Sequence, residues 1–410
     1  MSVATGLSVA GNYFAQPLLD VIGRDLGLSA STAALVVTVA QVGYGLGLLL
    51  LVPLGDLVDR RRLAVGLCAA TAVFLTVTAS APNGTLLLVG TALTGLASVA
   101  AQVVVPYAAT LAAPAERGRT VGTVMTGLLL GILLARTAAG LLADLGGWRT
   151  VYWVNAVLML LMAAALRLRL PVLPSTQPTQ PAGRGYPALI GSTLRLFADE
   201  PVLRWRAALG ALSFAPFSVL WTALVFLLSG PSYGWSEAEI GLLGLVGAAG
   251  SLAASTAGRL ADRGLVQHVS GIGALLLLGS WGLLALAGSG GAWPFVALLA
   301  GVIVLDLAVQ AVHISNQNLV YAVRPEARNR LNSAYMTSYF VGGAFGSALT
   351  SAVWGMAGWS GVCALGAALS AAGLAVWTVE RLRHRAVGGQ RPTEAATGTS
   401  SASTERAEAR

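Results

Sequence analysis

Two charged residues stand inside long apolar runs, and they are the first candidates for chemistry. Arg136 lies in GLLLGILLARTAAGLL, residues 127–142, and Asp306 lies in AGVIVLDLAVQAV, residues 300–312. A guanidinium does not lose its charge in proteins, so its surroundings must solvate or pair it. A carboxylate can bind and release a proton as its surroundings change. We therefore expect both side chains to face protein or a wet cavity, and to take part in solute binding or proton coupling.

A polar stripe extends from Asp306 along the same apolar run. Asp306, Gln310, His313 and Gln317 follow one another at i, i+4, i+7 and i+11, which places them on one helix face. His313 is a candidate for proton transfer near neutral pH, although a lone histidine more often only makes hydrogen bonds. Further amides and aromatic residues are candidates for the same cavity, with hydrogen bonding between helices as the alternative: Asn12, Gln16, Gln41, Tyr44, Gln102, Trp221, Tyr335 and Tyr339.

The other reactive residue types argue against several classes of protein. Three scattered histidines, at 268, 313 and 384, supply neither a nucleophile with its base nor a metal cluster, so we expect no enzyme, metal or cofactor. All 25 basic residues are arginines, which removes the lysine of a phosphate-binding loop. The net charge of +8 lies mostly in short loops and does not indicate a nucleic-acid partner. Cys68 and Cys363 lie in separate apolar runs and are expected to be packing residues.

These candidates need helices to position them, and the composition predicts helices that span a membrane. The chain has 410 residues, of which 56% are hydrophobic and only 10% are charged. The predicted fold is an all-α integral membrane protein with twelve transmembrane helices, six before and six after a polar linker. The spans are expected at about 2–22, 31–54, 63–81, 86–111, 120–142, 148–167, 204–229, 238–260, 265–288, 292–322, 331–354 and 359–380.

The loops between these spans predict the domain boundaries and the orientation. We expect an N-terminal bundle at 1–167, a cytoplasmic linker at 168–203, a C-terminal bundle at 204–381 and a disordered cytoplasmic tail at 382–410. The loops of one side contain only Arg24 and Arg149, whereas the other side holds 22 arginines. Because basic residues are retained on the cytoplasmic side, both termini are expected there, in a protein of the cell membrane. A start upstream of Met1 is left open.

A loop pattern occurs twice, at equivalent places in the two halves. GDLVDRRR follows the second span at 55–62, and GRLADRG follows the eighth at 258–264. Small glycines permit close helix approach, and an aspartate at a helix end can pair with nearby arginines. We expect these residues to form a conformational latch: Gly55, Asp59, Arg60, Gly258, Asp262 and Arg263. The alternative is that the arginines only set the topology.

On these motifs the sequence resembles the major facilitator superfamily across nearly its whole length. The segments NYFAQPLLD at 12–20 and LLLGILLARTAAGLLADLGGWR at 128–149 resemble the twelve-helix drug and metabolite efflux branch of bacteria. The resemblance implies two pseudo-symmetric six-helix bundles around a central cavity, alternating access and transport usually driven by protons. The sequence departs from the family's antiporter motif in the fifth span, where Ile132 replaces a proline and Arg136 replaces the final glycine.

The leading hypothesis is a secondary active transporter that exports a small organic solute in exchange for protons. Arg136 and Asp306, from opposite halves, would interact in only some conformations. Asp20 is the alternative partner of Arg136, and the arginine would then be a structural tie. Proton-coupled uptake is the alternative function, and a non-transporting membrane sensor is a further one. We expect a monomer in the lipid bilayer with a small-molecule solute and protons as its partners.

Overall fold

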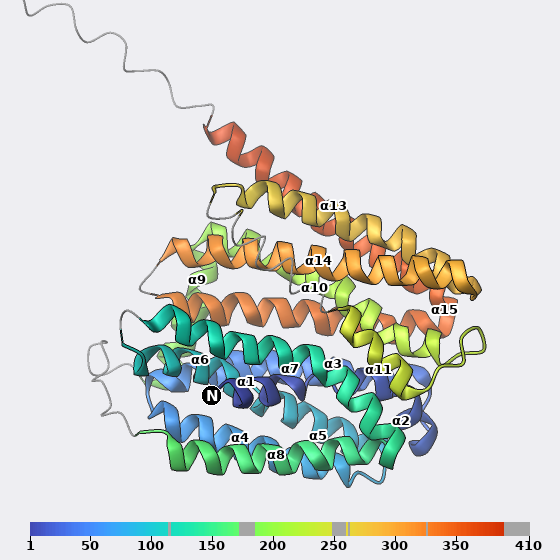
Figure 1. Cartoon of the computed structure of the whole chain (residues 1–410). Helices are drawn as coiled ribbons and strands as arrows, with labels where there is room; N and C mark the ends of the chain where they lie inside the picture. The colour runs from blue at the N-terminus through green and yellow to red at the C-terminus, as the bar shows by residue number, and fades with distance from the viewer. Residues whose placement is uncertain (114–115, 172–184, 248–259, 261–262, 325–326, 389–410) are drawn as a thin grey trace, which may run out of the picture.

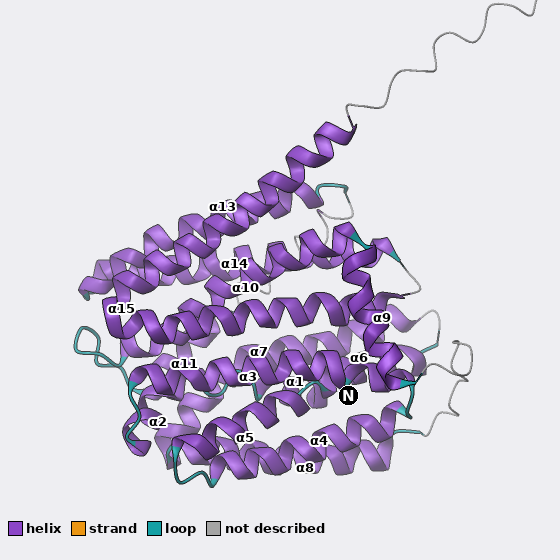
Figure 2. Cartoon of the chain, turned by 180° about the vertical axis from the view of Figure 1, so that it is seen from behind, coloured by secondary structure: helices purple, strands orange, loops and turns teal. Residues whose placement is uncertain are grey.

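The structure, a computed structural model, describes residues 1–113, 116–171, 185–247, 260, 263–324 and 327–388. Long helices lie roughly parallel to one another across the molecule (Figure 1). The described residues form helices and connecting loops without a strand (Figure 2). An all-helical architecture satisfies the backbone hydrogen bonds within each segment, which a lipid surrounding requires.

The N-terminal half, residues 1–171, contains the helices expected for the first six spans. They are α1 (Ser2–Ala10), η1 (Gln16–Leu18), α2 (Leu19–Leu26), α3 (Ala30–Leu50), η2 (Val52–Asp56), α4 (Arg60–Ala79), α5 (Gly84–Ala97), α6 (Ala100–Leu111), α7 (Arg117–Gly146) and α8 (Trp148–Arg169). The first predicted span is divided into α1, η1 and α2, and the fourth is divided into α5 and α6. Polar and proline residues in the first run explain its break, because Pro17 cannot donate a backbone hydrogen bond.

The C-terminal half, residues 201–388, is preceded in the chain by one further helix, α9 (Tyr186–Asp199). The elements of the C-terminal half are α10 (Pro201–Leu228), α11 (Glu237–Val246), α13 (Val266–Ala285), η4 (Leu286–Ser289), α14 (Ala292–Val323) and α15 (Arg328–Gly388). Gly358 has φ 54° and ψ −144° and divides α15 where the loop between two predicted spans was expected. Such a backbone conformation suits glycine because it has no Cβ.

Helix starts follow capping residues that the loops supply. The Ser29 hydroxyl accepts a hydrogen bond from the Thr32 amide, and the Asn83 side chain accepts one from the Leu86 amide. Ser236 and Glu239 form a reciprocal capping box at α11. Each cap satisfies amide groups that the first turn of a helix leaves without a partner, and so fixes where that helix begins.

Eight helices in the described part of the chain are long and apolar enough to cross a bilayer, or nine if one bent pair within α7 forms a single span. The remainder of the predicted eighth span lies outside the described residues. The structure therefore shows a membrane protein built from many spans, while the number twelve stays a prediction.

Two boundaries differ from the sequence prediction. The predicted linker contains α9, whose Leu189, Thr193 and Leu196 are buried at i, i+4 and i+7. This helical stripe was present in the sequence, next to the proline-rich segment that predicted an irregular linker. The tail was expected to begin at 382, but α15 continues to Gly388.

The two cysteines agree with the sequence prediction. Cys68 and Cys363 are both buried and free.

Candidate functional site

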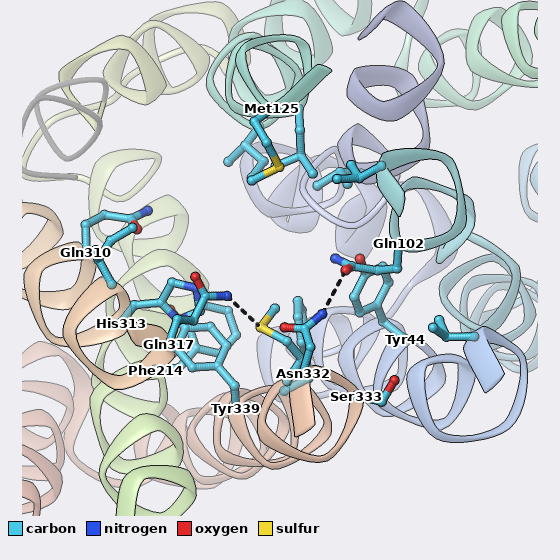
Figure 3. Close-up of a pocket in the computed structure, with 18 of the residues that line it drawn as sticks. Tyr44, Gln102, Met125, Phe214, Gln310, His313, Gln317, Asn332, Ser333 and Tyr339 are labelled. Atoms are coloured by element: carbon cyan, nitrogen blue, oxygen red, sulfur yellow. Dashed lines mark hydrogen bonds between the residues drawn. The ribbon is translucent and has the colours of Figure 1, made fainter. Parts of the chain in front are cut away.

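A cavity of about 740 Å³ lies between the two halves. Its wall combines aromatic and aliphatic side chains with a few polar groups contributed by both halves (Figure 3). Eight residues that the sequence predicted for the cavity or for proton coupling are part of this wall: Tyr44, Gln102, Arg136, Asp306, Gln310, His313, Gln317 and Tyr339. A mostly apolar cavity with a few convergent polar groups is the usual form of a small-molecule site.

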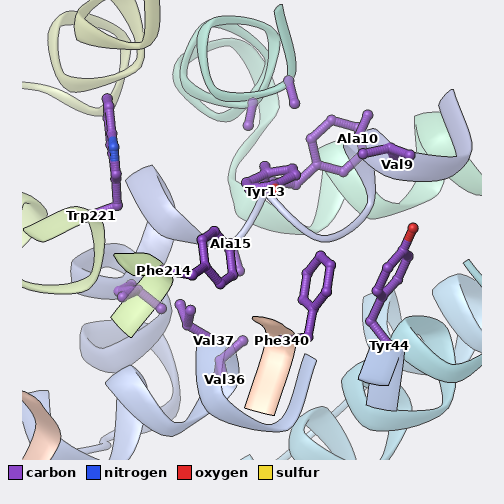
Figure 4. Close-up of a cluster of buried hydrophobic side chains, with 14 of the residues drawn as sticks. Val9, Ala10, Tyr13, Ala15, Val36, Val37, Tyr44, Phe214, Trp221 and Phe340 are labelled. Carbon is purple, nitrogen blue, oxygen red and sulfur yellow. The ribbon is translucent and has the colours of Figure 1, made fainter. Parts of the chain in front are cut away.

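Arg136 on α7 is only 4% exposed and lies among aromatic rings. Its guanidinium carbon is 3.8 Å from the centre of the Trp221 ring and 5.0 Å from that of Tyr13. Figure 4 shows these two rings among the buried side chains beside the cavity. The Arg136 Nε donates a hydrogen bond of 2.6 Å to the Gln16 Oε1. The aromatic faces and the amide oxygen therefore replace part of the water that the cation would have in solution.

Asp306 on α14 is 5% exposed and contacts the same indole. The Trp221 Nε1 donates a hydrogen bond of 3.3 Å to the Asp306 Oδ1. Among the described residues, no ion pair within 4.0 Å joins Asp306 to Arg136. The two charges thus share Trp221 as a neighbour without direct contact.

Asp20, the alternative partner of Arg136, makes its contacts elsewhere. Its Oδ2 is 2.9 Å from the Arg24 Nη2, which also lies 3.3 Å from the Glu237 Oε1. In this conformation the acid that lines the cavity together with Arg136 is therefore Asp306.

His313 on α14 takes part in an aromatic cluster at the cavity wall. Its Nδ1 lies 3.1 Å from the Tyr335 hydroxyl, and its ring centre is 4.6 Å from that of Tyr339. These contacts fit the hydrogen-bonding interpretation of a single histidine and leave proton transfer as a proposal.

A hydrogen bond connects the halves across the cavity, and a second one holds its donor Asn332 in the C-terminal half. The Asn332 Nδ2 donates to the Gln102 Oε1 at 3.4 Å, and the Tyr321 hydroxyl donates to the Asn332 Oδ1 at 2.7 Å. Sequence reasoning missed Asn332, although it precedes Tyr335 by three residues and Tyr339 by seven and so belongs to the same helix face. Phe214 and Phe217 also line the cavity, and nothing in the sequence distinguishes them from packing residues.

Five of the predicted cavity residues lie behind the wall. Gln16, Trp221 and Tyr335 contact the wall residues Arg136, Asp306 and His313. The Gln41 Nε2 donates a hydrogen bond of 2.7 Å to the Ser218 hydroxyl, which connects α3 to α10. Asn12 is buried, and its amide atoms have no partner among the described residues.

A second pair of buried charges lies in the C-terminal half and was missed by the sequence analysis. Arg206 on α10 and Glu380 on α15 form an ion pair, with side chains 0% and 2% exposed. Arg206 also donates a hydrogen bond of 3.1 Å to the Gln267 Oε1. The sequence signal was weak because Arg206 and Glu380 lie near the ends of their predicted spans, where a charge is usually a loop residue.

The predicted latch is only partly described. The Asp59 side chain accepts a hydrogen bond of 2.8 Å from the Arg62 amide and caps α4, while the Arg60 Nε donates one of 3.2 Å to the Gly55 carbonyl. Gly258 and Asp262 lie outside the described residues, and Arg263 is exposed.

The halves meet directly at the end of the molecule farther from the Gly55 loop. The Thr38 and Ser347 hydroxyl oxygens are 2.6 Å apart, and the Thr137 hydroxyl donates a hydrogen bond of 3.0 Å to the Gly241 carbonyl. The cavity wall, by contrast, continues to Gly55 and Arg330 at the loop end. In this conformation the halves are therefore in contact at one end, and toward the other the cavity lies between them, bridged by the hydrogen bond from Asn332 to Gln102.

Asp25, an exposed residue near the closed end, has a lowered pKa. The Trp148 Nε1 donates a hydrogen bond of 3.0 Å to the Asp25 Oδ2, and Arg149 forms an ion pair with the same oxygen. Both interactions favour the ionised carboxylate and hold the pKa of Asp25 below its usual range.

Many membrane-spanning helices around a large cavity, with polar groups converging from both halves, define a membrane transporter of small molecules rather than an enzyme. The chain belongs to the Major Facilitator Superfamily, whose family profile matches residues 1–321 and 212–406.

Similar proteins agree with that assignment. The uncharacterized transporter YgaY of Escherichia coli K12 is 54% identical over 377 residues, which cover 92% of this chain and 93% of YgaY. The transporter SCO4007 of Streptomyces coelicolor is 38% identical over 93% of this chain and 86% of its own length. The solved structure of the nucleoside transporter NupG has a TM-score of 0.73 at 14% identity and covers 92% of this chain and 98% of NupG. This last similarity shows the shared fold alone.

Proposed function

We propose that the protein exports a small organic solute by alternating access, in exchange for protons. The observation that carries the proposal is the buried carboxylate of Asp306 in the cavity wall, beside but not paired with Arg136. A carboxylate in such a place can hold either a proton or a polar group of the solute, and exchange requires that the two compete. The resemblance to efflux proteins supports the direction.

Arg136 supports this coupling from the opposite half. A movement of α7 toward α14 brings its cation nearer to Asp306 and favours the ionised acid, whereas a movement apart favours the protonated acid. Trp221 contacts both groups, so a shift in the position of either charged side chain also moves the indole that contacts the other. His313 is the proposed second site for a proton in transit.

The conformation supports a cycle between two states. We propose that the loop of Gly55, Asp59 and Arg60 faces the cytoplasm, together with both termini, because the arginine-rich loops lie on that side. The cavity then faces inward, and the contact of Thr38 with Ser347 closes the outer side. Export requires this contact to open while the loop end closes, with the latch residues of the two halves holding one of the states.

Asp306→Asn tests the proposal. We expect the variant to be expressed normally and to lose solute-dependent proton movement, because an amide keeps the shape but cannot carry the proton. The measurement uses the purified chain in liposomes with a pH-sensitive dye, an imposed pH gradient and a panel of solutes. Arg383→Gln is the matched control, since this exposed arginine lies over Trp205 and away from the cavity.

The same assay distinguishes the possible outcomes. Solute leaving the side that corresponds to the cytoplasm while protons enter supports exchange, and solute and protons moving together indicate uptake. Full coupling in Asp306→Asn contradicts the role of Asp306. A panel without any solute-dependent flux in the unaltered protein favours a non-transporting sensor.

A further inference from the structure

One end of the cavity presents a cation and an anion that do not neutralise each other by direct contact. Arg136 and Asp306 both line the cavity, and each is at least nine-tenths buried. The indole of Trp221 contacts both, with its face toward the guanidinium and its Nε1 on the carboxylate. Two opposite charges that contact the same indole form a pair of binding points in one part of the cavity.

Each of the two charges has hydrogen-bonding capacity that the described residues leave unused. The Arg136 Nε is occupied by Gln16, but its Nη2 is buried without an acceptor. Asp306 accepts its hydrogen bond from Trp221 through Oδ1, and no described residue donates to its Oδ2. An unfilled donor on a buried guanidinium is costly, so a ligand that brings an acceptor to it gains a charge-assisted hydrogen bond.

The surfaces around these two groups suit an apolar body. Phe217 and Tyr13 lie 5.7 Å and 5.0 Å from the Arg136 guanidinium carbon, measured to their ring centres. Phe214 stacks on Tyr339 with ring centres 4.1 Å apart, and both line the cavity. Aromatic walls favour a flat or aliphatic group carried by the solute beside its charged groups.

We propose that this end of the cavity binds a small zwitterion, with the solute's carboxylate on the Arg136 guanidinium and its ammonium group on Asp306. A solute with only a negative charge meets the repulsion of Asp306, and one with only a positive charge meets that of Arg136. A zwitterion satisfies both groups. Its ammonium group also occupies the oxygen that binds the proton, which supplies the competition that exchange requires. Only this link to protons rests on the proposed function.

The test compares solutes that share a body and differ in charge. Isothermal titration calorimetry on the purified full chain measures binding of phenylalanine and leucine, of their N-acetyl derivatives, which keep only the carboxylate, and of their amides, which keep only the ammonium group. We expect at least one zwitterion to bind about 10-fold or more tightly than both of its derivatives, because one charge-assisted hydrogen bond is lost in each. If neither amino acid binds more tightly than its derivatives, the proposal is wrong.

Two variants assign the charges. Arg136→Gln is expected to weaken binding of the zwitterion and to leave the amide bound at least as tightly as by the unaltered protein, because the repulsion of its ammonium group by Arg136 is removed. Asp306→Asn is expected to weaken binding of the zwitterion and to leave the N-acetyl derivative bound at least as tightly, because the repulsion of its carboxylate by Asp306 is removed. The Arg383→Gln control should bind all three as the unaltered protein does. Equal losses for all three solutes in both variants would contradict the assignment.

These results separate the inference from the proposed function. Zwitterion binding without proton movement in liposomes supports the site and contradicts exchange. Proton movement driven only by a singly charged solute supports coupling and overturns the zwitterion site.

Discussion

At the scale of single residues, buried charge is the most informative feature of this chain. Arg136 has aromatic rings and one amide as neighbours, whereas Arg206 has a carboxylate, two amides and a hydroxyl within reach. In the first arrangement no described carboxylate forms an ion pair with the cation, and in the second the cation is paired with a carboxylate of the same half. The Arg206 pair is therefore a structural connection between α10 and α15.

Arg206→Met is expected to destabilise the protein by about 3–5 kcal/mol, because it leaves Glu380 as an unpaired buried charge. The measurement is the apparent melting temperature of the purified protein in detergent. The double variant Arg206→Met with Glu380→Leu should recover much of the loss, since it removes both charges. A single variant with the same melting temperature as the unaltered protein would contradict a stabilising role of the pair.

At the scale of elements, glycines set how closely helices pack. A Cβ at Gly43 on α3 would lie 2.1 Å from the Ala92 carbonyl oxygen on α5. A Cβ at Gly95 on α5 would lie 2.3 Å from the Ala40 carbonyl oxygen on α3. Small residues on both helices thus allow the two backbones to touch, which is a common way for helices to associate in membranes.

Gly43→Ala is expected to destabilise the protein by about 1–3 kcal/mol, because the added methyl group forces α3 and α5 apart. Gly66→Ala on α4 is the matched control, since a Cβ there meets no atom within 4 Å. The control should be neutral or slightly stabilising through its higher helix propensity. Melting temperatures of both variants measure the difference, and equal values would contradict the packing argument.

At the scale of the whole molecule, the two halves touch at one end and enclose the cavity toward the other. The closed end includes hydroxyl groups of α3 and α15, an ion pair between α2 and α11, and a hydrogen bond from α7 to α11. Such small polar contacts suit an interface that must open and close, since each contributes little on its own.

A cross-link between the halves tests this arrangement. In the double variant Thr38→Cys with Ser347→Cys, the close approach of the two hydroxyl oxygens predicts that a disulfide can form. The oxidised protein is expected to lose solute flux in liposomes and to regain it after reduction. Each single variant serves as a control, because its new cysteine lacks the introduced partner while Cys68 and Cys363 are buried. Undiminished flux in a fully cross-linked sample would show that this end does not open during transport.

Local patterns in the sequence were enough to predict a membrane protein of helices and its superfamily. Long apolar runs indicate membrane spans whatever their tertiary contacts. Helical periodicity is also local, so the spacing of Asp306, Gln310, His313 and Gln317 indicates that they share one helix face. These four side chains and Arg136 could therefore be assigned to a cavity from the residue pattern alone. The linker helix α9 was also readable, but its stripe was short and followed a proline-rich segment.

The contacts between distant helices were decided only by the tertiary structure. Arg206 and Glu380 are 174 residues apart, and neither residue alone indicates its partner. The same holds for Trp221, which lies 85 residues from Asp306 and contacts both Asp306 and Arg136. Which side chains meet depends on the rotation and crossing of whole helices, and these follow from packing across the entire molecule. The sequence thus determined that Arg136 needed neighbours able to stabilise its charge. Only the structure decided that one of these neighbours, Trp221, also contacts Asp306.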